Sequence, residues 1–146
     1  MILDVTAGYR GIWFSKDDSD TVFLDRKKDC RPMVQGVWQS LPFPDNLFDM
    51  VVFDPPHMVL SEQNKGVMKA RYGYIDNRSF HSDFYRAFRE LFRVLKASGF
   101  LILKWNDHDK GLDKVLALTD MKPLFGQKTA VRTKHSSSTY WICFRK

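Results

Sequence analysis

Residues 50–60 read MVVFDPPHMVL. The apolar run Met50–Phe53 is typical of a buried β-strand. The run ends at Asp54, and the two prolines that follow stop the strand because proline restricts φ to about −65° and has no backbone N–H to donate. His57 then places an ionisable ring beside the acid. We therefore predict a buried strand that brings a carboxylate and an imidazole to one edge of a sheet.

Other apolar runs resemble this one, and helical patterns separate them. The four predicted buried strands are Ile2–Val5, Thr21–Leu24, Met50–Phe53 and Phe100–Lys104. Weaker strands are expected at Met33–Trp38 and, as an antiparallel edge pair, at Lys122–Phe125 and Tyr140–Phe144. Helices are expected at Phe80–Lys96 and Lys110–Leu118. Strands that alternate with helices predict an open α/β sheet of mostly parallel strands.

The composition of the 146 residues is that of a folded, basic protein. Apolar residues make up 44% and charged residues 27%, and no run approaches the roughly 18 apolar residues of a membrane span. We expect a single domain over residues 1–146, without a separate target-recognition domain. A secretory leader is not evident, and Cys30 and Cys143 are too far apart in sequence to indicate a zinc motif or a disulfide framework. These features predict a cytoplasmic protein with no metal and no membrane attachment, and its net charge of +6 favours polyanionic partners.

A glycine-containing turn, in the sequence DVTAGYRG, follows the first predicted strand. Ligands of open α/β sheets bind beyond the carboxyl ends of the strands, and glycine lets the backbone approach them closely. Asp4 lies at that edge, and Asp25 ends the next strand, where an acid can accept hydrogen bonds from ribose hydroxyls. The turn lacks the full G-x-G-x-x-G pattern, and its acid suits a cationic ligand better than a pyrophosphate. S-adenosylmethionine therefore fits better than NAD, while a tight turn with a surface acid is the purely structural alternative.

Several stretches resemble the class I S-adenosylmethionine-dependent methyltransferases. LPFPDNLFDMVV is similar to the segment leading into their fourth strand, and DPPH stands where the amino-methylating branch carries Asp/Asn-Pro-Pro-aromatic. FRVLKASGFLILKW, MKPLFG and TYWICFRK are similar to the segments that follow. With Asp-x-Thr-x-Gly near the start, the chain resembles most the small stand-alone methyltransferases of bacterial and phage genomes. The resemblance implies a Rossmann-like sheet of about seven strands, with an antiparallel carboxyl-terminal edge and helices on both faces.

The resemblance also implies roles for the DPPH residues. An exocyclic amino group of adenine or cytosine is a weak nucleophile because its lone pair is delocalised into the ring. The Asp54 carboxylate and the Pro55 carbonyl can accept its two hydrogens, and Pro56 stiffens the turn. His57 stands where the family has an aromatic residue that stacks on the target base. Three roles for His57 stay open: a smaller stacking plate, a group that takes the departing proton, or a structural residue.

The other predicted site residues form two groups. The cofactor would be held by Asp4, Thr6, Gly8, Asp25, Arg26, Gln39, Ser40 and Leu41. The substrate would contact Lys69, Arg71, Tyr72, Tyr74, Lys104 and Asn106. The first four of these belong to Met58–Asn77, a long segment without periodicity whose basic and aromatic side chains suit phosphates and bases. The alternative for that segment is a solvated lid that contacts no nucleic acid.

Three functions are compatible with the sequence. The first is methylation of an exocyclic amino nitrogen of a nucleic acid base, adenine N6 or cytosine N4, in DNA or RNA. The second is methylation of a small molecule at nitrogen or oxygen, with His57 as the base. The third is a catalytically silent module that binds nucleic acid, but such a module would not require Asp4, Asp25 and Asp54 together. Without a recognition domain, sequence selectivity would depend on the loops, on a homodimer or on a partner protein.

Overall fold

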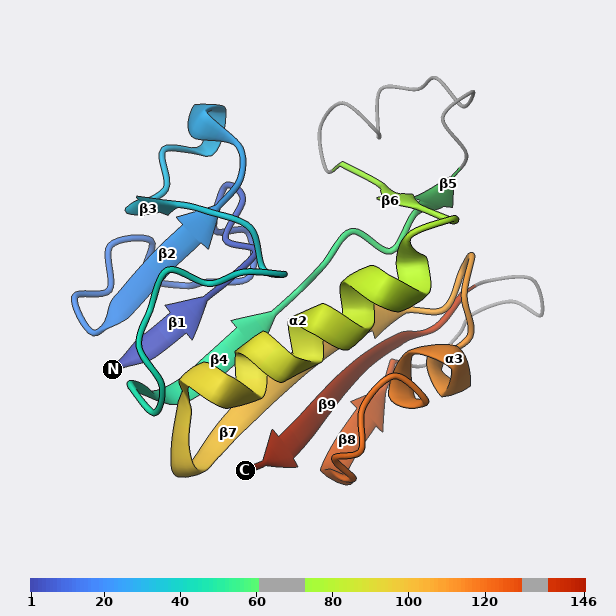
Figure 1. Ribbon diagram of the computed structural model, residues 1–146. Coiled ribbons are helices and arrows are strands. Elements are labelled where there is room, and N and C mark those ends of the chain that lie inside the picture. The colour runs from blue at the N-terminus through green and yellow to red at the C-terminus, as the bar shows by residue number, and fades with distance from the viewer. Residues whose placement is uncertain (61–72, 130–136) are drawn as a thin grey trace.

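The computed structural model describes residues 1–60, 73–129 and 137–146 of the chain, and its main element is a seven-stranded sheet (Figure 1). The order of the strands across the sheet is β3-β2-β1-β4-β7-β9-β8. Their bounds are β1 Ile2–Asp4, β2 Thr21–Asp25, β3 Val34–Gln35, β4 Phe48–Phe53, β7 Leu95–Asn106, β8 Pro123–Lys128 and β9 Thr139–Arg145. A second sheet has two strands, β5 Val59–Leu60 and β6 Ile75–Asp76. The helices are the 3-10 helix η1 Lys28–Cys30 and the α-helices α2 Phe80–Val94 and α3 Leu112–Leu116.

The direction of the strands agrees with the prediction from sequence. β3, β2, β1, β4 and β7 run parallel, and β9 and β8 form the antiparallel edge. The order of connection reverses at β1, because β2 and β3 lie on one side of it and β4 and β7 on the other. Open α/β sheets bind ligands beyond the carboxyl ends of the strands at such a reversal. In Figure 1 this edge is the upper one.

Helix α2 covers one face of the sheet with an apolar stripe at helical spacing. Its buried residues are Phe80, Phe84, Ala87, Phe88, Leu91 and Val94. The ring of Phe84 meets Trp105 of β7 edge to face, with centroids 5.5 Å apart, and also lies 5.9 Å from Phe53 of β4. The helix ends at Val94 rather than at the predicted Lys96, because Leu95 is already extended and pairs with Phe48 of β4. The aromatic layer beneath α2 therefore fixes β4, which ends just before Asp54, and β7, which contains Lys104 near its end.

The helical cover differs from the expected arrangement with helices on both faces. Val115 of α3 belongs to the same buried cluster as the apolar residues of α2, so both described α-helices pack on one face. Right-handed crossovers put the β1–β2 and β2–β3 connections on the opposite face. Those connections contain turns and η1 but no α-helix, since residues 8–20 are rich in Gly, Asp and Ser and lack helical periodicity.

The weaker predicted elements are present but short. The expected strand at Met33–Trp38 is reduced to β3, and the expected helix at Lys110–Leu118 is reduced to α3. β5 and β6 pair in parallel, Val59 opposite Ile75, and so close the ends of the segment that contains residues 61–72. Among the described residues, no helix has the length and the apolar character needed to cross a membrane.

Candidate active site

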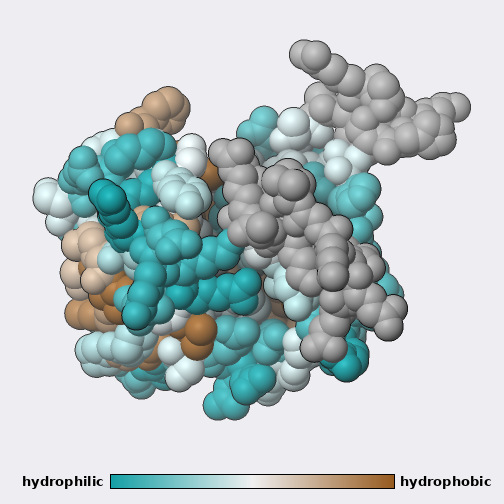
Figure 2. Space-filling model, turned by 90° about the horizontal axis from the view of Figure 1, so that it is seen from above, coloured by the Kyte–Doolittle hydropathy of each residue, from teal (hydrophilic) through white to brown (hydrophobic). Residues whose placement is uncertain are grey.

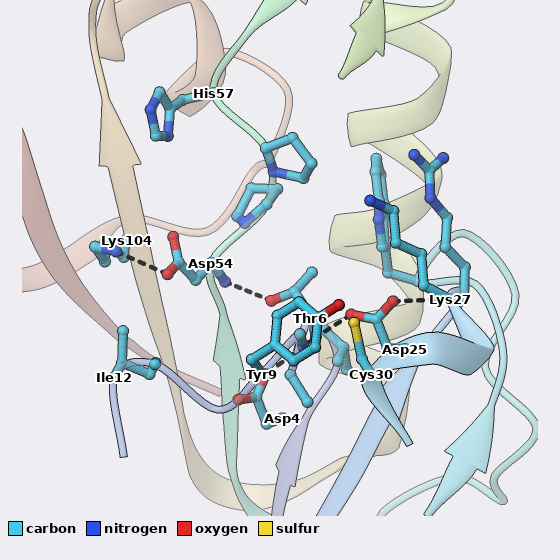
Figure 3. Close-up of a pocket in the computed structure, with 18 of the residues that line it drawn as sticks. Asp4, Thr6, Tyr9, Ile12, Asp25, Lys27, Cys30, Asp54, His57 and Lys104 are labelled. Atoms are coloured by element: carbon cyan, nitrogen blue, oxygen red, sulfur yellow. Dashed lines mark hydrogen bonds and ion pairs between the residues drawn. The ribbon is translucent and has the colours of Figure 1, made fainter. Parts of the chain in front are cut away.

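A cavity of about 520 Å³ lies at the carboxyl ends of β1, β2, β4 and β7, where polar residues from four strands meet. Seen from above, the middle of the described surface over this edge is mostly hydrophilic (Figure 2). The close-up shows Asp4, Asp25 and Asp54 around the cavity, with His57 farther along the segment that follows β4 (Figure 3). The cavity therefore joins the two halves of the site that the sequence predicts, the glycine turn and the DPPH motif.

Asp25 fixes the glycine turn to the end of β2. One carboxylate oxygen accepts a hydrogen bond from the backbone N–H of Gly8 at 2.8 Å, and the other accepts one from Lys27 N–H, also at 2.8 Å. Gly8 has φ of +50°, in the left-handed region that suits glycine. A carboxylate oxygen has two lone pairs, so Asp25 keeps acceptor capacity toward the cavity while its position is set by the backbone.

Asp4 is buried, with 1% of its surface exposed, and its two oxygens are already bonded within the protein. Trp13 donates its indole N–H to one oxygen at 2.7 Å, and the backbone N–H of Thr6 bonds to the other at 3.0 Å. Burial raises the pKa of Asp4 from its ordinary 3.8 to about 6, and the Trp13 hydrogen bond partly opposes that rise. Asp4 borders the cavity, but its hydrogen bonds make it above all the group that holds the turn against β1.

The ends of β1, β4 and β7 are tied together at Asp54. Its backbone N–H donates to the hydroxyl of Thr6 at 2.7 Å. Its carboxylate oxygen Oδ2 lies 2.7 Å from the ammonium nitrogen of Lys104, and both side chains are about one-quarter exposed. The sequence identified all three residues separately, but it did not predict that Lys104 pairs with Asp54. Among the described residues, the ion pair leaves Oδ1 of Asp54 without a hydrogen-bond donor.

The remaining DPPH residues also border the cavity. Pro55 is buried, whereas His57 lies toward solvent. Burial of part of its ring lowers the pKa of His57 from 6.5, and the nearby Asp54 carboxylate partly opposes this shift. At neutral pH the imidazole is therefore mainly uncharged, and one ring nitrogen can accept a proton.

The structure separates the predicted cofactor residues into those at the cavity and those away from it. Asp4, Thr6, Gly8, Asp25 and Arg26 border it. Gln39, Ser40 and Leu41 do not; Leu41 is buried in the core instead, and its N–H donates to Glu90 of α2 at 2.7 Å. Trp38, a neighbour of these three residues, does border the cavity, and its ring packs on Phe53 and Phe84.

Of the predicted substrate residues, Tyr74 and Lys104 border the cavity, and Lys69, Arg71 and Tyr72 lie outside the described residues. Asn106 is away from it, with its amide donating to Thr139 at 3.0 Å. The structure adds apolar and sulfur-bearing wall residues that sequence reasoning missed, namely Tyr9, Ile12, Cys30 and Met58. Their only sequence signal is proximity to the glycine turn, to Asp25 or to the DPPH motif. Within the described ranges, no cluster of His, Cys, Asp and Glu suited to a metal ion is found.

Comparison with known proteins finds no matching family model and no matching curated protein, whereas solved structures match over nearly the whole chain. An S-adenosylmethionine-dependent methyltransferase from Methanosarcina mazei is 14% identical, with a TM-score of 0.64 over 99% of this chain and 91% of that one. The N-methyltransferase NodS from Bradyrhizobium japonicum, solved with S-adenosylhomocysteine, is 10% identical, with a TM-score of 0.64 over 99% of this chain and 76% of that one.

The [4+2]-cyclase SpnF is similar to the same degree: 15% identical, with a TM-score of 0.64 over 99% of this chain and 74% of that one. These likenesses establish that the chain has the class I S-adenosylmethionine-dependent methyltransferase fold. Because the same architecture is also found in a cyclase, the reaction has to be argued from the site.

Proposed function

We propose that this protein is an S-adenosylmethionine-dependent methyltransferase that acts on an exocyclic amino nitrogen of a nucleic acid base. The observation that carries the proposal is that Asp25, at the end of β2 and bonded to the glycine turn, and Asp54, of the DPPH motif, border one cavity. One acid is placed to hold a cofactor and the other to hold the acceptor of its methyl group. The cavity, about 520 Å³, is within the usual range for small-molecule sites.

The chemistry of the cavity suits the cofactor. Asp25 is held rigidly by two backbone N–H groups and retains lone pairs for the ribose hydroxyls. Ile12, Cys30 and Trp38 supply an apolar wall for the adenine ring, and the carboxylates of the lining can face the ammonium and sulfonium groups of the ligand. When bound, S-adenosylmethionine supplies a methyl group on a positively charged sulfur.

The DPPH motif provides the acceptor side. Oδ1 of Asp54 and the carbonyl of Pro55 are two hydrogen-bond acceptors on adjacent residues, at a turn that proline makes stiff. Two such acceptors orient an amino group and localise its lone pair. Lys104 holds Oδ2, so the carboxylate keeps one orientation before the substrate arrives. The net charge of +6, together with basic residues after the motif, supports a nucleic acid as substrate.

A second candidate is methylation of a small molecule at nitrogen or oxygen, and the state of His57 favours it. A largely neutral imidazole beside Asp54 can take a proton from a hydroxyl or an ammonium group. The two candidates differ in what they require at this position. Stacking on a base requires an aromatic plate, whereas proton removal requires a basic ring nitrogen.

The test is transfer of a labelled methyl group to DNA, RNA, free nucleosides and a metabolite extract, followed by mass spectrometry of the products. We expect a methylated amino base in nucleic acid, and we expect Asp54→Ala to lower the rate at least about 100-fold, because positioning is lost. Asp120→Ala, at an exposed acid away from the cavity, serves as the control. Full activity of Asp54→Ala would contradict the proposed mechanism.

Two substitutions of His57 separate the candidates. If His57 stacks, His57→Phe retains most of the activity and His57→Gln loses it. If His57 removes a proton, both variants are slow, and the wild-type rate falls as the pH drops through the lowered pKa of the imidazole. Methylation of metabolites alone, with no product in DNA or RNA, would establish the second candidate in place of the first.

A further inference from the structure

One face of the sheet carries apolar side chains that no described helix covers. We call it the open face and define it by Ile2, Met50, Phe100, Ile102, Phe125 and Trp141. The register places these side chains together: Ile2 is opposite Met50, Met50 is opposite Phe100, and Phe125 and Ile102 are both opposite Cys143. Side chains alternate along a strand, so the buried Leu101, Leu103 and Phe144 point to the other face, toward α2.

Three large apolar side chains of the open face are well exposed, on β7, β9 and the edge strand β8. Phe125 is 67% exposed, Phe100 39% and Trp141 36%. The side chains of Ile2, Met50 and Ile102 are each partly exposed. Contiguous apolar patches of this kind mark interaction sites more often than isolated exposed residues do.

The sequence of the strands indicates that the open face is built to be covered. Parallel strands with cover on one side alone alternate apolar and polar residues, whereas strands covered on both sides are apolar throughout. β4 ends in MVVF and β7 contains FLILKW, which are apolar at consecutive positions. The α2 side of these residues is fully buried, and the other side is the open face.

We propose that the open face is the docking site for one amphipathic α-helix of a partner protein, with an apolar stripe and acidic flanks. The opposite face of the same strands shows what such a surface accepts, since α2 lies there with its own apolar stripe. A sheet covered by helices on both sides is the stable form of this architecture.

The charges at the margin favour acidic flanks on the helix. Arg145 stands opposite Phe100 and is exposed, so it places a cation beside the open face. Lys104, opposite Trp141, is instead paired with Asp54. The acid at the amino-terminal margin, Asp49, is already bonded to the amine of Met1 at 2.7 Å and to Lys96 at 2.8 Å. With a net charge of +6 on the chain, a second copy brings like charges together.

The size of the open face also favours a helix over a second copy. Five strands spaced by about 4.8 Å, and three rows of side chains about 6.7 Å apart, give a surface of roughly 400 Å². A stable dimer buries about 800 Å² on each partner. A helix as long as α2, with 15 residues, is about 22 Å long and about 10 Å wide, so it spans the open face along its length and covers about half of its area.

The test uses the whole chain and a synthetic peptide as the probe. The peptide has about sixteen residues, with Leu at helical spacing on one side and Glu on the other, and the control peptide has the same composition in scrambled order. Isothermal titration calorimetry measures binding to the wild type and to two single variants. Phe125→Glu places a charge on the open face, whereas Tyr85→Glu, at a 53% exposed residue of α2, places one on the helix that covers the other face of the sheet. Both substitutions are at exposed positions, so the fold is retained in each.

We expect the amphipathic peptide to bind with micromolar affinity, the scrambled peptide not to bind, and Phe125→Glu, but not Tyr85→Glu, to weaken binding at least about tenfold. Replacing Glu by Lys in the peptide should weaken binding as well. No binding at about 100 micromolar peptide, or equal losses in the two variants, would overturn the proposal. A wild-type dimer in sedimentation velocity that Phe125→Glu dissociates would also overturn it, because the occupant would then be a second copy.

Discussion

At the scale of single residues, Asp4 shows how one carboxylate can serve the fold at the edge of a functional site. The sequence places it at the end of a strand beside a glycine turn, which is where a ligand is expected. In the structure, both of its oxygens accept hydrogen bonds from the turn itself, from Trp13 and from Thr6. A buried carboxylate is costly when charged, and these two donors compensate for part of that cost.

This arrangement predicts a pH-dependent effect of Trp13→Phe. The folded-state pKa of Asp4 is raised to about 6, so its ionisation costs stability as the pH rises from about 4 through 6. Removing the indole N–H raises that pKa further, because the hydrogen bond favours the charged form. We expect the free energy of unfolding to fall by about 1–3 kcal/mol at pH 8 and by less at pH 5, where Asp4 is mostly protonated. Urea denaturation at the two pH values measures the difference.

Trp141→Phe is the control, because this indole lies on the open face and is 36% exposed. We expect it to change stability by less than about 0.5 kcal/mol at either pH. An equal loss at pH 5 and pH 8 in Trp13→Phe would mean that packing of Trp13 on Phe23, and not its bond to Asp4, accounts for the effect.

The predicted site residues that border the cavity share one property, which is their place in the chain relative to a strand. Asp25 and Asp54 each stand at the end of an apolar run. Parallel strands bring the ends of such runs together, and this does not depend on the conformations of the side chains. The ion pair of Asp54 with Lys104 depends on two side-chain conformations across neighbouring strands, and no periodicity encodes these. The same holds for Trp38, whose side chain reaches the cavity wall while its neighbours Gln39 and Ser40 do not.

At the scale of elements, the segment that carries Trp38 is held against α2 by polar contacts. The guanidinium of Arg93 donates to the carbonyls of Leu41 and Phe43, at 3.1 and 2.8 Å, and pairs with Glu90 and Asp45. Hydrogen bonds to these acids raise the pKa of Arg93, so its charge is present throughout the accessible pH range. One arginine thereby ties the β3–β4 connection to the helix.

We therefore predict that Arg93→Met lowers the free energy of unfolding by about 1–3 kcal/mol, because two backbone carbonyls and a partly buried Glu90 lose their donor. Loss of this tie also loosens the wall that contains Trp38, so cofactor affinity should fall several-fold. Denaturation and calorimetry with S-adenosylhomocysteine measure the two effects. Arg89→Met, on the exposed side of the same helix, should leave both values unchanged. A stability loss with unchanged affinity would place Trp38 outside the binding wall.

The helices are the elements for which the sequence was a weaker guide. Periodicity located α2 well because its apolar stripe is complete over 15 residues. The expectation of helices on both faces came from resemblance to a family, and the residues of the β1–β2 connection do not support it, since they form turns. Local composition therefore described this connection better than the family architecture did.

At the scale of the whole molecule, the open face and the cavity are two separate regions of the surface. The cavity lies at the carboxyl edge of the sheet, and the open face lies on its flank, with Lys104 bordering both. A helix on the open face would therefore approach the residue that pairs with Asp54. Covering the face and filling the cavity are then two separate ways to stabilise the same sheet.

Filling the cavity gives the most direct test of the molecule as a whole. A ligand that binds only the folded state stabilises it by RT ln(1 + [L]/Kd), or about 2.7 kcal/mol at one hundred times Kd. For a chain of 146 residues this corresponds to a rise in Tm of roughly 5–10 °C. We expect saturating S-adenosylhomocysteine to produce this rise in wild type and in Asp120→Ala, and to produce almost none in Asp25→Ala, which loses the proposed ribose acceptor. Differential scanning calorimetry measures the shift, and an unchanged Tm in the wild type would exclude the cofactor that the cavity is proposed to hold.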